Sequence, residues 1–324
     1  MPSLFSRFFR HIPRPEARAV LVSLSVGVLM LGVKFLAYYY TRSAAILSDA
    51  LEGIVNIAAA GFATFALSTA HRPADVDHPY GHGKIEFLSA AFEGGMIILA
   101  ALLIFGESVL EIWRIHQGAH TVARLEAGAF LVAVAMAVHG LLGGYLIQAG
   151  KRVESMTIEA DGWHLLSDAA SSAAALVALL VVKMTGWLYA DPIGALVIGL
   201  YITHTGYKLL RRSAAGLMDE QDFSDQKLLI GILDAHVGPN GKEPRICSYH
   251  KLRHRHSGRY HWVDFHLMVP NTWDIQRGHA VASTIEYEIE QALHSGNATA
   301  HIEPCQDKDC ANCATQGVHP TSPA

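Results

Sequence analysis

Apolar residues are concentrated in the first two thirds of the chain, in long runs separated by short polar segments. A helix needs roughly 20 predominantly apolar residues to cross the hydrocarbon of a bilayer. Six runs reach that length, at 17–40, 44–69, 87–113, 121–148, 157–183 and 186–210. The pattern therefore predicts an α-helical membrane protein with a six-transmembrane-helix bundle over residues 17–210.

After Arg211-Arg212 the chain turns polar and rich in histidine, and roughly 110 residues remain, enough for one small domain. Apolar periodicity and β-branched content there predict helices and strands in the order αββαβ, a C-terminal α+β domain. The expected elements are a helix at 224–237, strands at 245–254 and 260–269, a helix at 274–294 and a short strand at 298–303. We divide the chain into a tail (1–16), the membrane domain (17–210), the soluble domain (211–304) and a cysteine-containing tail (305–324).

Basic residues are unevenly distributed between the two sides of the expected membrane. One side collects Arg7, Arg10, Arg14, Arg18, Arg72, Lys84, Lys151, Arg152, Lys208, Arg211 and Arg212, and the other has Arg42, Arg114, Arg124 and Lys183. The positive-inside rule then places both termini and the soluble domain in the cytoplasm. We expect an integral protein of the bacterial inner membrane.

Net charge and cysteine usage narrow the possible partners. The formal net charge of −4 argues against nucleic acid as a partner. All four cysteines lie in the expected cytoplasmic domain, where thiols stay reduced and metal binding is favoured over disulfides.

The most informative polar residues in the apolar spans are His164 and Asp168, one helical turn apart and so on one face. Ionisable groups at bilayer depth usually line a polar pathway, and nitrogen with oxygen ligands suits a divalent transition metal. Asp49, Glu52 and Asn56 in span two also share a face. Together the two faces predict a membrane metal site, against the alternative of a hydrogen-bonded network that only joins two helices.

Two polar segments outside the spans offer further ligands. The loop after span two holds Asp75, His78 and His82 between stiffening Pro and Gly residues, which favours a ligand cluster over a solvated loop. Near the end of the chain Cys305, Cys310 and Cys313 form a partial thiolate pattern that indicates either an additional metal site or incidental thiols. In the first strand, His254 and His256 are expected to face solvent.

At these motifs the chain resembles the cation diffusion facilitator family. The resemblance rests on Asp75, His78 and Gly81-His82-Gly83-Lys84, on His164 and Asp168 after Ala160-Asp161, and on Ala190-Asp191-Pro192-Ile193-Gly194, and it spans about residues 15–304. It implies a homodimeric exporter of zinc or similar divalent ions, working in exchange for protons, with a metallochaperone-like soluble domain.

The resemblance also assigns roles to residues of this chain. It implies a transport site at Asp49, His164 and Asp168, a loop site at Asp75, His78 and His82, and a charge interlock of the dimer between Lys84 and Asp219. It further implies a binuclear site in the soluble domain at His250, His266, His301 and Glu303, with His279 as another candidate.

One departure concerns the transport site. The family commonly has a second aspartate four residues after the first, where this chain has Gly53. Glu52, Asn56 or water then fills the fourth position, or the site has three ligands, which leaves the choice of metal open.

The residues alone also favour exchange with protons, because histidine and carboxylate ligands must be deprotonated to bind metal. We therefore expect a secondary transporter in the bilayer that exports zinc by alternating access, with Zn²⁺ also as a structural or regulatory ion. Iron(II), manganese, cobalt and cadmium are alternative substrates. A membrane-anchored metal sensor remains an alternative, and a metalloenzyme would need a substrate pocket and a general base for which the sequence shows no motif.

Overall fold

The computed structural model describes residues 12–41, 44–118, 126–293, 295–307, 310–311 and 313. The chain divides into two compact units, Met1–Leu217 and Met218–Ala324. Among the described residues, the first unit contains helices and no strand, and the second combines helices with a sheet.

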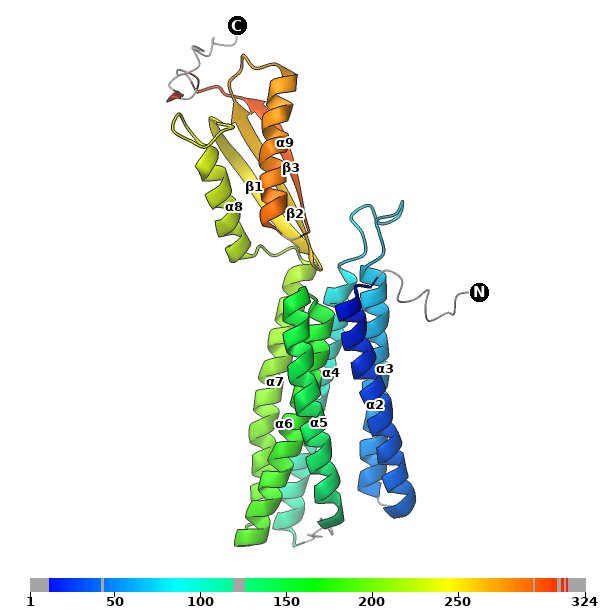
Figure 1. Cartoon of the computed structure of the whole chain (residues 1–324). Coiled ribbons are helices and arrows are strands. Elements are labelled where there is room, and N and C mark those ends of the chain that lie inside the picture. The colour runs from blue at the N-terminus through cyan, green and yellow to red at the C-terminus, as the bar shows by residue number, and fades with distance from the viewer. Residues whose placement is uncertain are drawn as a thin grey trace, which may run out of the picture. The chain divides into compact units, whose positions relative to one another are not determined.

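Six long helices form the first unit. They are α2 (Arg14–Thr41), α3 (Ala44–Ala70), α4 (Ile85–His116), α5 (Glu126–Val153), α6 (Met156–Thr185) and α7 (Ala190–Leu217) (Figure 1). Within the described residues five helices are long and apolar enough to cross a membrane, and α3 adds the apolar stretch Asn56–Ala70. The predicted helical membrane architecture is confirmed, although α5 and α7 run beyond their expected ends at 148 and 210. The expected start of the fourth span, at 121, lies outside the described residues.

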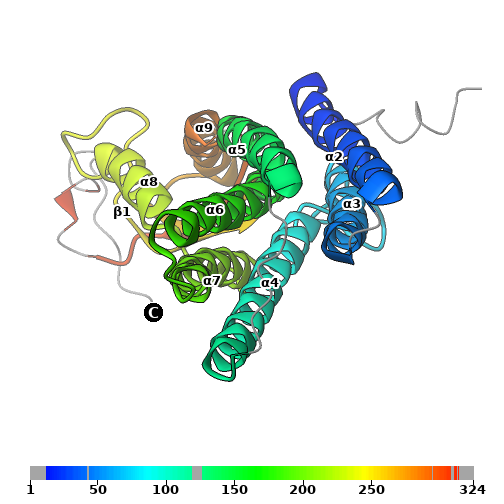
Figure 2. The same cartoon turned by 90° about the horizontal axis from the view of Figure 1, so that it is seen from below.

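Helix α6 is fixed tightly in this bundle. The most extensive helix pairs are α5 with α6 and α4 with α7, and α3 contacts both α4 and α6 (Figure 2). A Cβ atom added to Gly143 on α5 would lie 2.9 Å from the carbonyl oxygen of Gly162 on α6, and one added to Gly162 would lie 2.7 Å from the backbone nitrogen of Ile147. Only glycine permits this approach, as is common between membrane helices. The close packing holds in place the helix that carries His164 and Asp168.

The second unit has the predicted αββαβ order. Its elements are α8 (Phe223–His236), β1 (Ser248–Ser257), β2 (Tyr260–Val269), α9 (Ile275–Ala292) and β3 (Gly296–Pro304). The strands form one sheet in the order β1-β2-β3, with β1 antiparallel and β3 parallel to β2. The second strand has the predicted bounds, whereas β1 begins and ends three residues later than expected because its last residues pair with the start of β2.

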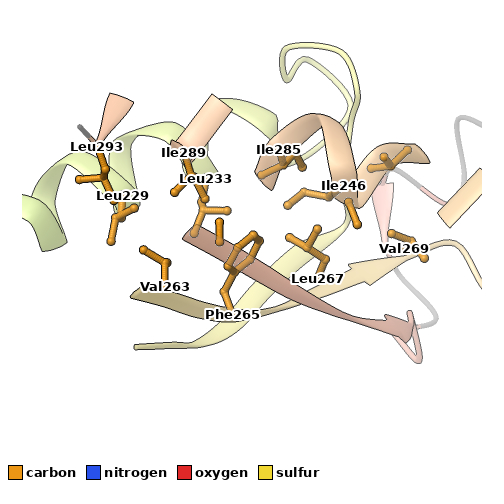
Figure 3. Packing of buried hydrophobic residues seen from close by; sticks show 13 residues of the cluster. Leu229, Leu233, Ile246, Val263, Phe265, Leu267, Val269, Ile285, Ile289 and Leu293 are labelled. Carbon is orange, nitrogen blue, oxygen red and sulfur yellow. The ribbon is translucent and has the colours of Figure 1, made fainter. Parts of the chain in front are cut away.

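Both helices cover one face of this sheet. Leu229 and Leu233 of α8 and Ile285 and Ile289 of α9 pack on side chains of β2, and all of these residues are buried (Figure 3). Val263, Phe265, Leu267 and Val269 alternate along β2 and point toward the helices. Because side chains alternate along a strand, His266 projects from the opposite, open face.

A β-bulge in β1 changes which of its side chains face the helices. The register with β2 shifts between His250 and Arg253, and Lys251 within the bulge has a φ of 51°. The extra residue reverses the alternation, so that His250 pairs with His266 while His254 pairs with the core residue Val263. The expectation that His254 and His256 face solvent is wrong: His254 is only 8% exposed, and His256 is half-buried.

Candidate metal sites

The membrane unit brings Asn56 of α3 against the two ligand candidates of α6. Asn56 Nδ2 donates a hydrogen bond to Asp168 Oδ2 at 3.2 Å, and Asn56 Oδ1 lies 3.3 Å from His164 Nε2. His164 is buried and Asp168 is half-buried. The side chains of Asp49 and Glu52 lie outside the described residues, so their part in this site stays a prediction. An imidazole, a carboxylate and an amide oxygen from two helices form a mixed nitrogen and oxygen donor set for a divalent metal.

A small cavity adjoins this donor set. Its volume is about 30 Å³, which is enough to hold a water molecule. The residues lining it include Gly53, Asn56, His139, Asp161 and His164. Gly53, which stands where the resemblance led us to expect a carboxylate, thus leaves space beside these side chains.

Two further buried acidic residues of the membrane unit were not chosen from the sequence as ligands. Asp161, one turn before His164 on α6, is buried and accepts a hydrogen bond from Ser23 Oγ of α2 at 2.7 Å. Glu93 of α4 is fully buried, lies within electrostatic range of His164, Asp161 and Asp168, and neither of its carboxylate oxygens has a hydrogen-bond partner among the described residues. The sequence could have pointed to Glu93 because it lies in an apolar span, where an ionisable residue usually has a functional role.

The loop between α3 and α4 brings together the three residues expected there. His78 Nδ1 and His82 Nε2 lie 3.2 and 3.3 Å from the two oxygens of Asp75. The carboxylate is also fixed by the backbone amides of Asp77 and His78, at 3.1 and 2.7 Å. The His78 hydrogen bonds hold the pKa of Asp75 below its ordinary value, chiefly through the backbone amide. The ring nitrogens and carboxylate oxygens are close enough together to bind one ion.

On the open face of the soluble sheet, Glu303 of β3 is the centre of a histidine cluster. Its oxygens lie 2.7 Å from His266 Nδ1, 3.3 Å from His250 Nε2 and 3.8 Å from His301 Nε2. These residues are neighbours because His250 pairs with His266 across β1 and β2, and His266 pairs with His301 across β2 and β3. The hydrogen bond from His266 lowers the pKa of Glu303.

His279, the further candidate for this site, lies exposed on α9 and is not within the group formed by His250, His266 and Glu303. Its part in a second ion site stays a prediction. The same holds for the interlock of Lys84 with Asp219, whose carboxylate lies 3.6 Å from Arg255 Nη1 within the soluble unit.

A second histidine cluster in the soluble unit was not expected from the sequence. Asp225 in the first turn of α8 lies 3.1 Å from His256 Nε2 and 3.0 Å from His261 Nδ1, and the two rings are 4.3 Å apart. The adjacent imidazoles of His256 and His261 hold the pKa of Asp225 well below its ordinary value. Burial lowers the pKa of the neighbouring His254. The bulge in β1 produces this cluster, because it turns His254 and His256 toward the helices.

All four cysteines of the chain meet at one end of the sheet. The sequence pattern singled out Cys305, Cys310 and Cys313, and the structure adds Cys247, whose Sγ lies 3.5 Å from that of Cys313. Cys247 lies within the strand expected at 245–254, and its position there did not mark it as a partner of the other cysteines.

Comparison with known proteins agrees with both units. Residues 20–218 match the family model of the cation efflux transmembrane domain, and residues 241–305 match that of the cation efflux protein cytoplasmic domain. An uncharacterized transporter of Synechocystis is 36% identical over 300 residues, which is 92% of each chain. The cation-efflux pump FieF of Shewanella oneidensis is 28% identical over 289 residues, 88% of this chain and 92% of that protein. The pump of the same name from Shigella flexneri is 27% identical over 293 residues, covering 90% and 94%.

Proposed function

The chain belongs to the cation diffusion facilitator family, and from this premise we propose that it exports zinc in exchange for protons through the site at His164 and Asp168. Members of this family are transporters of divalent metal cations and not enzymes. The metalloenzyme alternative is thereby set aside. Beyond family membership, the proposal specifies zinc as the metal, protons as the exchanged ion, and the residues that bind them.

The contact of Asn56 with both His164 and Asp168 is the observation that carries the proposal. It joins α3 to α6 through groups that can themselves bind metal, and it supplies an oxygen donor despite Gly53. Asp49, expected on the same face of this helix, would supply a second carboxylate. With Asn56, His164 and Asp168 it would give a four-coordinate set, which is typical of zinc.

Proton exchange follows from the chemistry of these ligands. Zinc binds the deprotonated imidazole and carboxylate, so that protons and metal compete for one site. When the metal leaves, His164 and Asp168 take up protons, and the hydrogen bonds with Asn56 then hold the metal-free site together. Glu93 and Asp161, buried beside the site, are the groups that we expect to respond to the change of charge by gaining or losing protons.

The soluble unit is proposed to lie in the cytoplasm with both termini and to join two copies of the chain in the bacterial inner membrane. The loop cluster at Asp75 and the cluster around Glu303 would then capture zinc on the side from which it is exported. Lys84 and Asp219 are the candidates for a charge interlock of the dimer.

The experiment is a flux measurement with purified protein in liposomes, offering zinc, iron(II), manganese and cobalt in separate assays. Zinc is expected to move fastest, and His164→Ala and Asp168→Asn should each abolish its flux. Thr64→Ala is the matched control on α3, since the Thr64 hydroxyl donates a hydrogen bond within its own helix, to the Ala60 carbonyl. If another metal moves faster than zinc, that metal is the substrate. Unchanged zinc flux in both variants would overturn the assignment of the transport site.

The sensor alternative makes a different forecast. Deleting residues 218–324 should leave a basal zinc flux if the membrane unit is the transporter. If the full-length, correctly folded protein shows no zinc flux, the sensor alternative is favoured.

A further inference from the structure

Backbone pairing brings two cysteines to the same end of the soluble sheet. Since β1 is antiparallel to β2 and β3 is parallel to it, the start of β1 and the end of β3 both lie beside the end of β2. Cys247, directly before β1, donates its amide to the Met268 carbonyl at 2.8 Å. Cys305, directly after β3, donates its amide to the Val269 carbonyl at 2.7 Å. The sheet itself therefore fixes these two thiols near each other.

The segment that follows β3 returns the other two cysteines to this point. Cys313 Sγ lies 3.5 Å from Cys247 Sγ, and the sulfur atoms of all four cysteines lie within 4.8 Å of one another. Cys305 and Cys313 are 2% and 1% exposed. In a tetrahedral site with zinc–sulfur bonds of 2.3 Å, neighbouring sulfur atoms are about 3.8 Å apart. The cluster thus has nearly the size that a tetrathiolate ion requires.

We propose that Cys247, Cys305, Cys310 and Cys313 form a tetrathiolate site that holds one structural Zn²⁺ and fastens Cys310 and Cys313 to the sheet. Four mutually close thiols suit one tetrahedral ion better than two disulfides, because each sulfur has three sulfur neighbours rather than one. All four cysteines are free thiols in the structure. A cytoplasmic location, which belongs to the proposed function, would also keep them reduced.

This site differs in kind from the histidine and carboxylate clusters. Four thiolates close the coordination shell and leave no open position for exchange, whereas transport and capture sites must release their ion. Sulfur ligands also select soft or borderline ions and disfavour manganese and magnesium. The ion is therefore a permanent part of the fold, and its binding free energy adds to the stability of the soluble unit.

The test uses the full-length protein in detergent under reducing conditions, with Co²⁺ replacing Zn²⁺ as a spectroscopic probe. The chain has only four cysteines, so a thiolate-to-cobalt charge-transfer absorption reports this cluster alone. We expect the absorption to saturate at one equivalent of Co²⁺ per chain and to disappear on addition of Zn²⁺. The double variant C310S/C313S should lose it, and Cys310→His, which keeps a metal ligand at that position, should restore a tetrahedral cobalt spectrum relative to Cys310→Ser.

His266→Ala is the matched control, because it removes a ligand from the other cluster of the sheet and should leave the charge-transfer absorption unchanged. A second measurement needs no variant: zinc should slow alkylation of the native thiols at least tenfold, and a strong chelator should reverse this. Absence of the absorption in the intact reduced protein, or equal alkylation rates with and without zinc, would overturn the proposal.

Discussion

Asn56 on α3 donates a hydrogen bond to Asp168 on α6, at 3.2 Å between Nδ2 and Oδ2. Its other amide atom faces His164, so one neutral side chain contacts both ligand candidates of α6. An amide oxygen is a weaker and uncharged donor compared with the aspartate that relatives commonly carry one turn earlier. Asn56 therefore adds no charge of its own to the site, and its role can be tested by introducing a charge at this position.

Replacing Asn56 with aspartate adds a negative charge and a ligand that competes for protons. We expect Asn56→Asp to strengthen zinc binding above neutral pH and to make it fall more steeply as pH decreases, because one more group must deprotonate. Asn56→Ala, which removes the donor, should weaken zinc binding at least about tenfold. Calorimetric titration at several pH values measures both effects, and identical pH slopes for Asn56→Asp and the intact protein would contradict this role.

Glu93 is predicted to affect proton coupling more than metal binding. Its buried carboxyl group lies near the site without a hydrogen-bond partner among the described residues. Glu93→Gln keeps the shape but cannot exchange a proton, so it should reduce zinc flux driven by a pH gradient while changing the zinc dissociation constant less than threefold. Glu107, on the same helix, supplies the control variant Glu107→Gln. A parallel loss of affinity and flux in Glu93→Gln would instead mark Glu93 as a ligand.

Asp225 is predicted to stabilise the soluble unit in a pH-dependent manner. Its pKa is lowered in the folded state by the adjacent imidazoles of His256 and His261, so the folded state favours the ionised form. That contribution is fully present above the unfolded pKa of about 3.9 and is lost as pH falls through the lower folded value. Asp225→Asn should cost about 1 kcal/mol at pH 7 because the pair is partly solvated.

Amide hydrogen exchange of β1 and β2 in the full-length protein measures this difference. We expect faster exchange in Asp225→Asn than in the intact protein at pH 7. The difference between the two exchange rates should be smaller below pH 4. The variant Asp264→Asn, at an exposed position of β2, should exchange like the intact protein. A difference in exchange rate that grows as pH falls would contradict the stabilising role of ionised Asp225.

The cluster on the open face should bind metal through Glu303 as its central ligand. Glu303→Gln removes the charge that faces His250, His266 and His301, and it should weaken zinc binding to the soluble unit at least about tenfold. His279→Ala tests the candidate that lies outside this group: loss of a second bound zinc would establish it as a ligand of a binuclear site, and an unchanged stoichiometry would remove it. Zinc stoichiometry is read by mass spectrometry of the intact protein.

Periodicity in the sequence predicted the helices and the second strand because apolar alternation reports directly which side chains are buried. The shared face of His164 and Asp168 on α6 was also predictable, since both residues interrupt an apolar run at helical spacing. The side of β1 on which His254 and His256 lie was not predictable. A single extra residue between His250 and Arg253 reverses the alternation, and no local pattern marks that bulge.

Cys247 and Glu93 were not predicted as site residues for another physical reason. Cys247 joins Cys305 only because β3 is parallel to β2, a property of the tertiary topology that sequence spacing does not encode. Glu93 is brought near His164 by packing of α4 against α6. Ligand sets drawn from several elements thus depend on contacts between elements, whereas pairs within one helix can be read from spacing.

The most direct test of the central claim follows zinc and protons together in liposomes that contain the purified protein and a pH-sensitive dye. Zinc added on one side should drive protons in the opposite direction, an imposed pH gradient should drive zinc, and His164→Ala should abolish both movements while Thr64→Ala preserves them. Zinc flux through the intact protein that neither moves protons nor responds to the pH gradient would contradict exchange at this site.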